Sequence, residues 1–381
     1  MNEYITAVEV CDDYNPDRVR EQLCKLIEAS GDLSWLKPGM RIGIKLNLCA
    51  AMKPETAATT HPVVAAELTR LLVERGAEVV LGDSSAGPFT QSGLKNLYNA
   101  TGMYLCEAVG GKLNMDTEVT EVDFKEGVVL KKFSFTKWLA DCEVVISLCK
   151  LKSHGLMGMT AAVKNTYGII PGTKKSEMHF RYSRPEDFAN IMVDLNEYLK
   201  PKLYICDAID CMEGNGPTQG TVRHMGLLLA NENPYRLDRV CAALVNVQES
   251  EIPYLIAAKQ RGLLPEEKPD RQDMIDRFAL ADFEHSGATS SWFLINPEDG
   301  IIKKMLKRTL AALLGSKPAL GKGCIGCGHC KKLCPAGAIS IHNNKAVIDR
   351  KKCVKCFCCQ EFCPKGAMIV KRTVVARLLQ R

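Results

Sequence analysis

Hydrophobic and polar positions along the first 300 residues predict short buried strands separated by single helices. Residues 61–76 and 234–247 have the periodicity of amphipathic helices. Apolar runs with the length of buried strands occupy residues 40–48, 77–83, 142–150, 202–210 and 226–233. Strands that alternate with helices are typical of βαβ units, so we expect residues 1–300 to form an α/β domain, with a mostly parallel sheet covered by helices on both faces.

The segments that follow these strands are rich in Gly, Ser, Thr and charged residues. They cover residues 48–62, 84–93, 150–172 and 211–224. In sheets of this kind, ligands bind beyond the carboxyl ends of the parallel strands. The sequence therefore predicts a single binding site at that edge of the sheet.

The stretch from Lys150 to Gly172 contains the strongest candidates for chemistry. We expect His154 on a loop and Lys164 on the short helix that follows, where histidine can shuttle a proton and a partly buried lysine can bind or protonate an oxyanion. Lys45 ends the first strong strand, where an inward lysine needs an anion or a carboxylate. These three are the predicted catalytic residues. The predicted binding residues are Asn47, Asp83, Ser84, Ser85, Lys152, Ser153, Asn165, Asp207, Glu213 and Asn215.

Each candidate also has a purely structural explanation. His154 could cap a helix or complete a buried hydrogen bond, and Lys45 could pair with Asp207 across neighbouring strand ends. The sequence has no G-x-G-x-x-G after a strand and no G-x-x-x-x-G-K-[ST], so neither a Rossmann dinucleotide site nor a P-loop is supported. Flavin binding requires no single motif, and the sequence leaves open whether a flavin or another organic cofactor is bound.

Nine of the eighteen cysteines lie between Cys324 and Cys363. They form the run C-x2-C-x2-C-x3-C-P twice, which is the pattern of bacterial ferredoxins that hold two 4Fe–4S clusters and in which the fourth cysteine of each run binds the other cluster. Zinc also binds paired C-x-x-C motifs but requires neither the third cysteine nor the repeated Cys-Pro ending. Cys358 is not needed as a ligand. We assign Cys324, Cys327, Cys330 and Cys363 to the first cluster, and Cys353, Cys356, Cys359 and Cys334 to the second.

The net charge of +6 is unevenly distributed, because residues 301–381 hold 18 Lys and Arg against 2 Asp and Glu. This basic region divides into a helix and linker (301–317), the two-cluster domain (318–372) and a tail (373–381). It fits a docking surface for an acidic electron carrier of ferredoxin or flavodoxin type. A solvated basic face is the alternative, and the few aromatic residues among the lysines count against nucleic acid.

Several segments predict where the protein is found. The chain lacks an apolar run of about 18 residues, so no transmembrane segment is expected. The acidic N-terminus does not resemble a secretory signal, and cysteines without such a signal favour a reducing compartment. We therefore expect a cytoplasmic protein.

Several fragments resemble the domain-of-unknown-function family 362, described as uncharacterised iron–sulfur centre proteins. They include IKLNL, TTHP, RGAEVVLGDSSAG, LKSHGLMGMTAAVKNTYG and DAIDCMEGNGPTQG. The fourth fragment resembles the family's lysine–threonine–histidine signature, with Ser153 in place of the threonine. The resemblance implies an α/β domain followed by a ferredoxin-type tail, and it supplies no reaction.

The sequence thus favours an oxygen-sensitive iron–sulfur oxidoreductase of anaerobic type, in which the tail relays electrons to a small anionic substrate or organic cofactor in the α/β domain. Two alternatives stay open. The chain could be a non-catalytic adapter that delivers electrons to a partner enzyme, or an isomerase whose clusters are regulatory.

Overall fold

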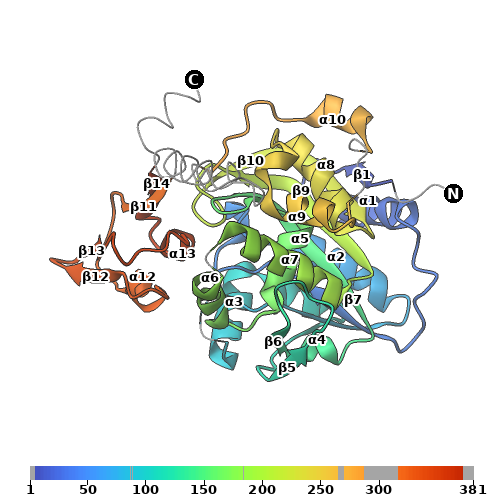
Figure 1. Cartoon of the computed structure of the whole chain (residues 1–381). Coiled ribbons are helices and arrows are strands. Elements are labelled where there is room, and N and C mark those ends of the chain that lie inside the picture. Colours follow the sequence, from blue (N-terminus) through green and yellow to red (C-terminus); the bar gives the residue numbers. More distant parts are fainter. Residues whose placement is uncertain are drawn as a thin grey trace.

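The computed structural model describes residues 5–85, 87, 89–182, 184–264, 270–286 and 316–371. Figure 1 shows a large body, which ends at residue 286, and a small C-terminal part at one side of it. We call residues 316–371 the cluster module. The predicted basic helix (301–315) and the predicted tail (373–381) lie outside the described residues.

The body is built on a mixed sheet in which the strands follow the order β1-β10-β9-β7-β2-β3-β4, with β8 paired to β7. Neighbouring strands from β9 to β4 are parallel, whereas β10 is antiparallel to both of its neighbours. The expected α/β fold with a mostly parallel sheet is therefore confirmed. The strands are β1 (Ala7–Val10), β2 (Arg41–Lys45), β3 (Glu78–Gly82), β4 (Lys112–Leu113), β7 (Val144–His154), β8 (Gly158–Thr160), β9 (Leu203–Glu213) and β10 (Thr221–Asn231).

Helices cover both faces of this sheet, because residues of each buried strand alternate between two apolar cores. In β7, Ile146 and Leu148 pack with α1, α2 and α3, whereas Cys149 and Leu151 pack with α5, α7, α8 and α9. The helices of the body are α1 (Pro16–Ala29), α2 (Pro62–Val73), α3 (Gln91–Thr101), α4 (Lys137–Ala140), α5 (Ala162–Asn165), α6 (Lys174–Arg181), α7 (Pro185–Leu199), α8 (Pro234–Leu244), α9 (Pro253–Gln260) and α10 (Gln272–Phe278).

Shorter elements complete the body. The antiparallel strands β5 (Val119–Asp123) and β6 (Lys132–Thr136) form a separate hairpin. Tight 3-10 turns cover residues 54–56, 103–109, 166–169 and 249–251.

Two of the predicted strands continue beyond their expected ends. Strand β7 runs through His154, because its last residues pair with β8 in a hairpin (Lys152↔Thr160, His154↔Gly158). The prediction that His154 lies on a loop is therefore wrong. Strand β9 similarly continues to Glu213 and turns directly into β10, because the intervening residues are too few for a crossover helix.

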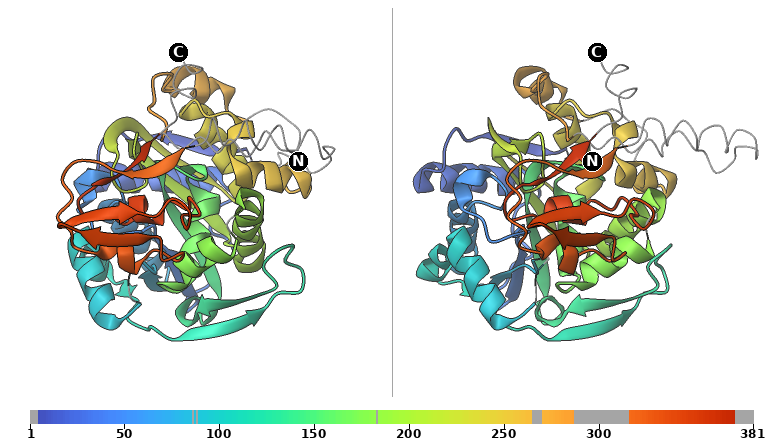
Figure 2. Two further views of the ribbon diagram at one scale, coloured as in Figure 1. Left: turned by 60° about the vertical axis from the view of Figure 1, so that its left-hand side comes forward. Right: turned by 90° about the vertical axis from the view of Figure 1, so that its left-hand side faces the viewer.

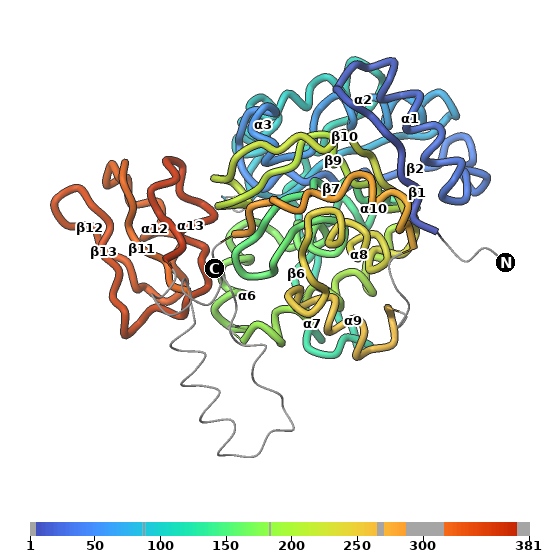
Figure 3. The backbone as a smooth tube through the Cα atoms, turned by 90° about the horizontal axis from the view of Figure 1, so that it is seen from above, coloured from blue at the N-terminus to red at the C-terminus, as the bar shows by residue number. Residues whose placement is uncertain are grey.

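The cluster module consists of two small antiparallel ribbons and two single-turn helices. Its elements are β11 (Lys317–Leu320), α12 (His329–Lys332), β12 (Ile339–His342), β13 (Lys345–Ile348), α13 (Cys358–Glu361) and β14 (Met368–Lys371). Strand β11 pairs with β14 and β12 pairs with β13. Figures 1 and 3 show α13 on the side of the module that faces the body, with β12 and β13 on the far side.

The two cysteine runs adopt the same local backbone. The residues on either side of the middle cysteine have positive φ in both runs: Gly326 (67°) and Gly328 (73°) in the first, Lys355 (56°) and Phe357 (62°) in the second. Left-handed residues reverse the chain direction within one turn. This curvature directs successive cysteine side chains toward a common space.

Candidate functional site

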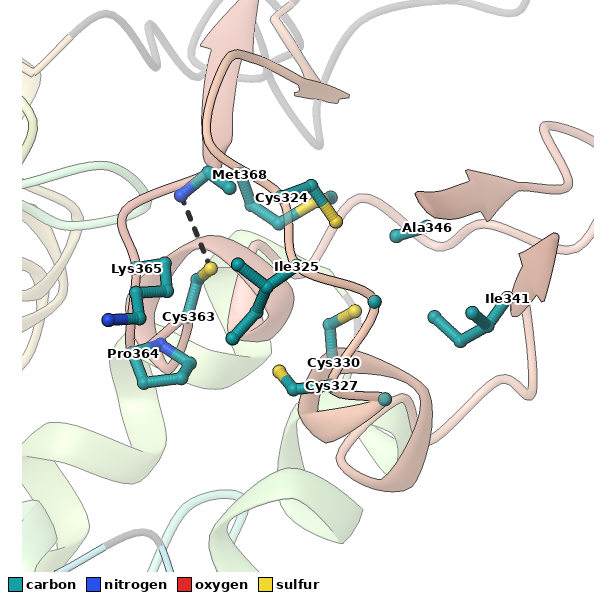
Figure 4. Close-up of a pocket in the computed structure, with 13 residues that line it drawn as sticks. Cys324, Ile325, Cys327, Cys330, Ile341, Ala346, Cys363, Pro364, Lys365 and Met368 are labelled. Carbon is teal, nitrogen blue, oxygen red and sulfur yellow. Dashed lines mark hydrogen bonds between the residues drawn. The ribbon is translucent and has the colours of Figure 1, made fainter. Parts of the chain in front are cut away.

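Cysteine thiols surround two hollows in the cluster module, four at the first hollow and five at the second. The first hollow, of about 340 Å³, is shown in Figure 4, where the sulfur atoms of Cys324, Cys327, Cys330 and Cys363 lie around a shared space. The second, of about 330 Å³, is lined by Cys334, Cys353, Cys356 and Cys359. These are the two sets that the motif predicts. Cys358 also lines the second hollow.

The residues around these hollows suit iron–sulfur clusters. Neither hollow has a carboxylate or imidazole among its described lining residues. The last cysteine of each run accepts a backbone hydrogen bond, from Ala338 N to Cys334 Sγ (3.2 Å) and from Ala367 N to Cys363 Sγ (3.3 Å). Thiolate ligands with N–H donors at sulfur are characteristic of such clusters.

A third and larger hollow, of about 580 Å³, lies between the body and the cluster module, and we call it the site cavity. It lies at the carboxyl ends of β2, β3 and β7, and Glu361 at the end of α13 also lines it. Its lining residues are Asn47, Cys49, Asp83, Ser84, Lys152, Thr160, Lys164, Asn165, Tyr167, Gly168, Lys175, His179, Pro217, Thr218, Glu361 and Phe362.

A buried ion pair lies beside the site cavity, with its carboxylate, Asp83, on the cavity wall. The ammonium of Lys45 lies 2.8 Å from Asp83 Oδ1, so the alternative pairing of Lys45 with Asp207 is wrong. Asp83 also accepts hydrogen bonds from the backbone N–H groups of Leu48 and Ser84. Burial lowers the pKa of Lys45, and Asp83 opposes that shift. Lys45 does not line the cavity itself, and its side chain is nearly inaccessible.

Two asparagines connect neighbouring strand ends beside this ion pair. Asn47 donates to Asn165 Oδ1 (3.1 Å), and Asn165 donates to Ser147 Oγ (2.9 Å). Lys152 donates to Asn47 Oδ1 (2.8 Å) and to Ala58 O (2.6 Å). The side chains of Asn47, Lys152 and Asn165 are thus held in place by bonds within the body.

Gly168 is required for the close packing over the ion pair. A Cβ atom at this position would overlap Asp83 Oδ1 and the end of Lys45. Replacing Gly168 with alanine should therefore separate the pair and destabilise the protein by about 3–5 kcal/mol, the usual cost of breaking a buried ion pair. Denaturation of the anaerobic protein measures the effect. Gly87→Ala is the matched control, because the nearest atom to its Cβ lies 3.8 Å away; equal stability of the two variants would contradict this account.

Lys164 and Lys175 bring two further amines to the site cavity. Lys164, on α5, is partly open to the cavity, and its Nζ lies 5.9 Å from the centre of the Tyr167 ring. Burial lowers its pKa, and Glu361 opposes the shift. Lys175 donates to Ser84 O (2.7 Å) and Ile170 O (2.5 Å). Burial lowers the pKa of Lys175 to about 7, although Asp83 opposes that shift.

His154 lies behind Glu361 and not on the described wall of the cavity. Its Nδ1 accepts hydrogen bonds from the backbone N–H groups of Leu156 and Met157, which places the proton on Nε2. Nε2 lies 2.9 Å from Glu361 Oε1. Burial lowers the pKa of His154 to about 4, so the ring is neutral near pH 7. Burial opposes ionisation of Glu361, but its cationic and imidazole neighbours lower its pKa below the ordinary value.

The loop between β9 and β10 connects the body to the cluster module. Thr218 Oγ1 donates to Glu361 O, and Gln219 Nε2 donates to Cys363 O (3.1 Å). In the opposite direction, Gln360 Nε2 donates to Asn215 Oδ1 (3.0 Å). These hydrogen bonds hold the module against the body, and the turned views in Figure 2 show the module lying over that side of the body.

The remaining predicted site residues lie elsewhere. Asp207 is fully buried, pairs with Lys150 (2.9 Å) and accepts from Tyr14 OH, so it belongs to a separate buried cluster. Ser153 bonds to Gly214 O and Gly216 N and thus shapes the loop after β9. Glu213 accepts from the backbone N–H of Glu284. Asn215 contacts the module, and Ser85 is not among the described lining residues.

Sequence reasoning missed Thr160, Lys175, His179, Glu361 and Phe362. One signal for Glu361 was available, because it is one of two acidic residues in the last 81 residues of the chain. An isolated carboxylate in a basic segment needs a specific partner, which here is His154. Thr160, Lys175 and His179 carried no comparable signal.

Comparisons with known proteins match both parts of the chain. A family model described as domain of unknown function (DUF362) matches residues 42–243, and one described as 4Fe-4S dicluster domain matches residues 319–364. A thylakoid-associated protein of Synechocystis sp. is 31% identical over 259 residues, which cover 66% of this chain and 78% of that protein. The dicluster domain gives the chain an iron–sulfur electron-transfer role.

Two solved structures are similar to part of this chain. One is a Thermotoga maritima protein (TM-score 0.35, 14% identity, 54% of this chain and 53% of that chain). The other is the lactate racemase apoprotein from Thermoanaerobacterium thermosaccharolyticum (TM-score 0.36, 14% identity, 58% and 54%). The chain spans about half the length of each.

Proposed function

The chain belongs to the DUF362 family, and we propose that it is an iron–sulfur oxidoreductase that delivers electrons from its cluster module to a small anionic substrate or organic cofactor in the site cavity. One observation carries the proposal: Glu361 and Phe362 line this cavity while standing between the cluster cysteines Cys359 and Cys363. When bound, the two clusters supply one-electron transfers. A reduction of the ligand by two electrons also takes up two protons, and the electrons come from a reduced carrier of ferredoxin or flavodoxin type.

The residues of the body would have distinct tasks in this reaction. Lys164 faces the cavity and would contact the ligand or its developing negative charge. Lys45 and His154 act through their partners, since Lys45 fixes Asp83 and His154 fixes Glu361. We therefore assign catalytic contact to Lys164 and positioning roles to Lys45 and His154.

The proposal includes a docking surface for the electron carrier around the first hollow. Cys327 is exposed there, and Ile325 is 58% exposed. Lys322 and Lys365 flank them and are also exposed. An apolar contact ringed by lysines would suit an acidic carrier.

Reversing charge on this surface should slow electron entry. We expect Lys322→Glu together with Lys365→Glu to lower the rate of reduction by a reduced acidic ferredoxin about tenfold at low salt, because steering is lost. Reduction by dithionite should stay unchanged. A charge reversal at the exposed Lys112 in the body, combined with one at Lys95, is the matched control. Equal slowing by both pairs would remove the support for this surface.

No described helix is both long and apolar enough to cross a membrane. A cytoplasmic, anaerobic setting belongs to the same proposal, because reduced thiols and iron–sulfur clusters both persist in a reducing compartment.

The proposal is tested by an inventory of what the protein carries. Protein purified without oxygen is analysed for iron and sulfide, and the small molecules released on denaturation are identified by mass spectrometry. An organic anion at about one per chain beside about eight irons is expected. About eight irons with no organic molecule would favour the adapter, in which the module serves a partner enzyme.

A further inference from the structure

Three side chains on the wall of the site cavity can donate hydrogen bonds that the described residues do not accept. One acceptor on the same wall, Glu361 Oε1, is also without a hydrogen bond there, although it lies 2.9 Å from His154 Nε2. The ammonium of Lys164 forms no hydrogen bond or ion pair within the described part of the chain. Thr160 Oγ1 is buried without a partner among the same residues. The ring of His179 stacks on Phe188 (4.2 Å between centroids), and its nitrogens are likewise unbonded within the described ranges.

Buried polar groups are normally satisfied, so these three indicate a missing ligand. An ammonium offers donors alone, a hydroxyl can donate, and a neutral imidazole carries one N–H. Burial lowers the pKa of His179 to about 4, which keeps its ring neutral near pH 7. A ligand that meets all three is therefore rich in acceptor oxygens.

The other two lysines of the wall contribute charge and not free donors. Lys152 already has acceptors in Asn47 Oδ1, Ala58 O and Cys49 Sγ. Lys175 is likewise bonded to Ser84 and Ile170. Both are nearly inaccessible to solvent, and neither has a carboxylate partner among the described residues.

The charges around the cavity are unbalanced in favour of the amines. Lys45, Lys152, Lys164 and Lys175 face two carboxylates, Asp83 and Glu361. The clusters do not need this excess, because the module has its own surplus of Lys and Arg. Buried charge without a partner is costly, so a bound anion with two negative charges would complete the site.

We propose that the site cavity binds a dianion, whose oxyanion group contacts Lys164, Thr160 and His179. The positive charges of Lys152 and Lys175 stabilise the dianion electrostatically. This inference rests on the proposed function, since it narrows the substrate or cofactor of the same cavity. Dicarboxylates and phosphate-type groups share the required chemistry.

Binding at this site should depend on pH through Lys175. The charged groups that face it are Asp83, Lys45 and Lys164, and its pKa in the free protein is about 7. A dianion favours the ammonium form, so binding above pH 7 requires uptake of a proton, and affinity should fall by up to about tenfold per pH unit. Sulfate is the probe, because it keeps its charge from pH 7 to 9. In Lys175→Met, the affinity for sulfate should no longer fall as the pH rises. A slope equal to that of the native protein would remove Lys175 from the site.

The direct test is calorimetric titration of the full-length, anaerobically purified protein with sulfate, succinate and acetate. At least one of the two dianions should bind more than about tenfold more tightly than acetate, because acetate leaves one amine unpaired. Tighter binding of sulfate would indicate a phosphate-type ligand, and tighter binding of succinate a dicarboxylate. The inference would be overturned if neither sulfate nor succinate gave binding heat. It would also be overturned if acetate bound as tightly as the tighter of the two dianions.

Two variants locate the binding. Thr160→Val keeps the shape of the side chain and removes a hydroxyl without a described protein partner; it should weaken dianion binding about tenfold, as loss of a hydrogen bond to a charged group does. Lys164→Met should weaken it further, and Lys112→Met, on the surface, should not. Native affinity in both cavity variants would place the anion elsewhere and overturn the inference. Dianion binding without any electron delivery would instead reject the proposed function alone.

Discussion

Replacing Cys359 with alanine is expected to halve the iron content, from about eight to about four per chain, and to open the site cavity. Cys359 is one of the four assigned cluster ligands among the five thiols around the second hollow, and it follows Cys358 in α13. The same helix ends at Glu361, which closes the cavity and contacts His154. Loss of the cluster should therefore also loosen the contact between module and body.

Iron and sulfide analysis with electron paramagnetic resonance of the reduced protein measures the first effect. Limited proteolysis between module and body measures the second. Cys358→Ala is the matched control, because Cys358 adjoins Cys359 and is fully buried but is not assigned as a ligand. If Cys358→Ala loses four irons while Cys359→Ala keeps eight, the ligand assignment of the second run is wrong.

Lys164→Met is expected to abolish retention of the organic anion in the site cavity while leaving about eight irons in place. Of the three lysines on the cavity wall, Lys164 alone donates no hydrogen bond to another described residue. The substitution removes a positive charge from a site where attraction between charges is strong, because little water screens it. The affinity for the organic anion should therefore fall by about two orders of magnitude or more. Methionine is unbranched and keeps most of the length of the lysine side chain, which limits the structural disturbance.

The same mass-spectrometric inventory checks this result on protein purified without oxygen. Lys345→Met is the control for loss of a lysine in general, since Lys345 is exposed on β13 and lies outside both cysteine runs. A full complement of the organic molecule in Lys164→Met would show that it is held elsewhere. Loss of iron in that variant would show that Lys164 has a structural role for the module.

The cluster cysteines were predictable because the motif that identifies them lies within a short stretch of sequence. Each run fixes three cysteines within seven residues, and the residues on either side of Cys327 and Cys356 share the same left-handed backbone. The α/β fold was predictable for a similar reason, since the central residues of buried strands are apolar, as in β2 (42–44) and β3 (79–81).

The site cavity was predictable only in part. Asn47, Asp83 and Lys164 follow strand ends, and the topology of a parallel sheet brings such residues together. Asp207 lies within β9 instead, and its side chain bonds to Lys150 and Tyr14. Which way a side chain points at a strand end depends on register, and β7 and β9 both continue past the residues where their apolar runs end.

The contact between Glu361 and His154 is the clearest example of a feature that local sequence patterns do not predict. It approaches His154 across more than 200 residues of chain, through docking of the module on the loop between β9 and β10. The spacing of the cysteines describes the module alone and does not encode where it rests. The contact depends on the fit of two folded surfaces.

The central claim is that electrons from the module reach a molecule in the site cavity, and a single-turnover experiment tests it most directly. Protein purified without oxygen, with its organic molecule bound, is reduced with a stoichiometric amount of dithionite, and the released molecule is weighed by mass spectrometry while cluster absorbance is followed. The account predicts that the molecule gains two hydrogen atoms as the absorbance of the oxidised clusters returns. Clusters that stay reduced beside an unchanged molecule would contradict it.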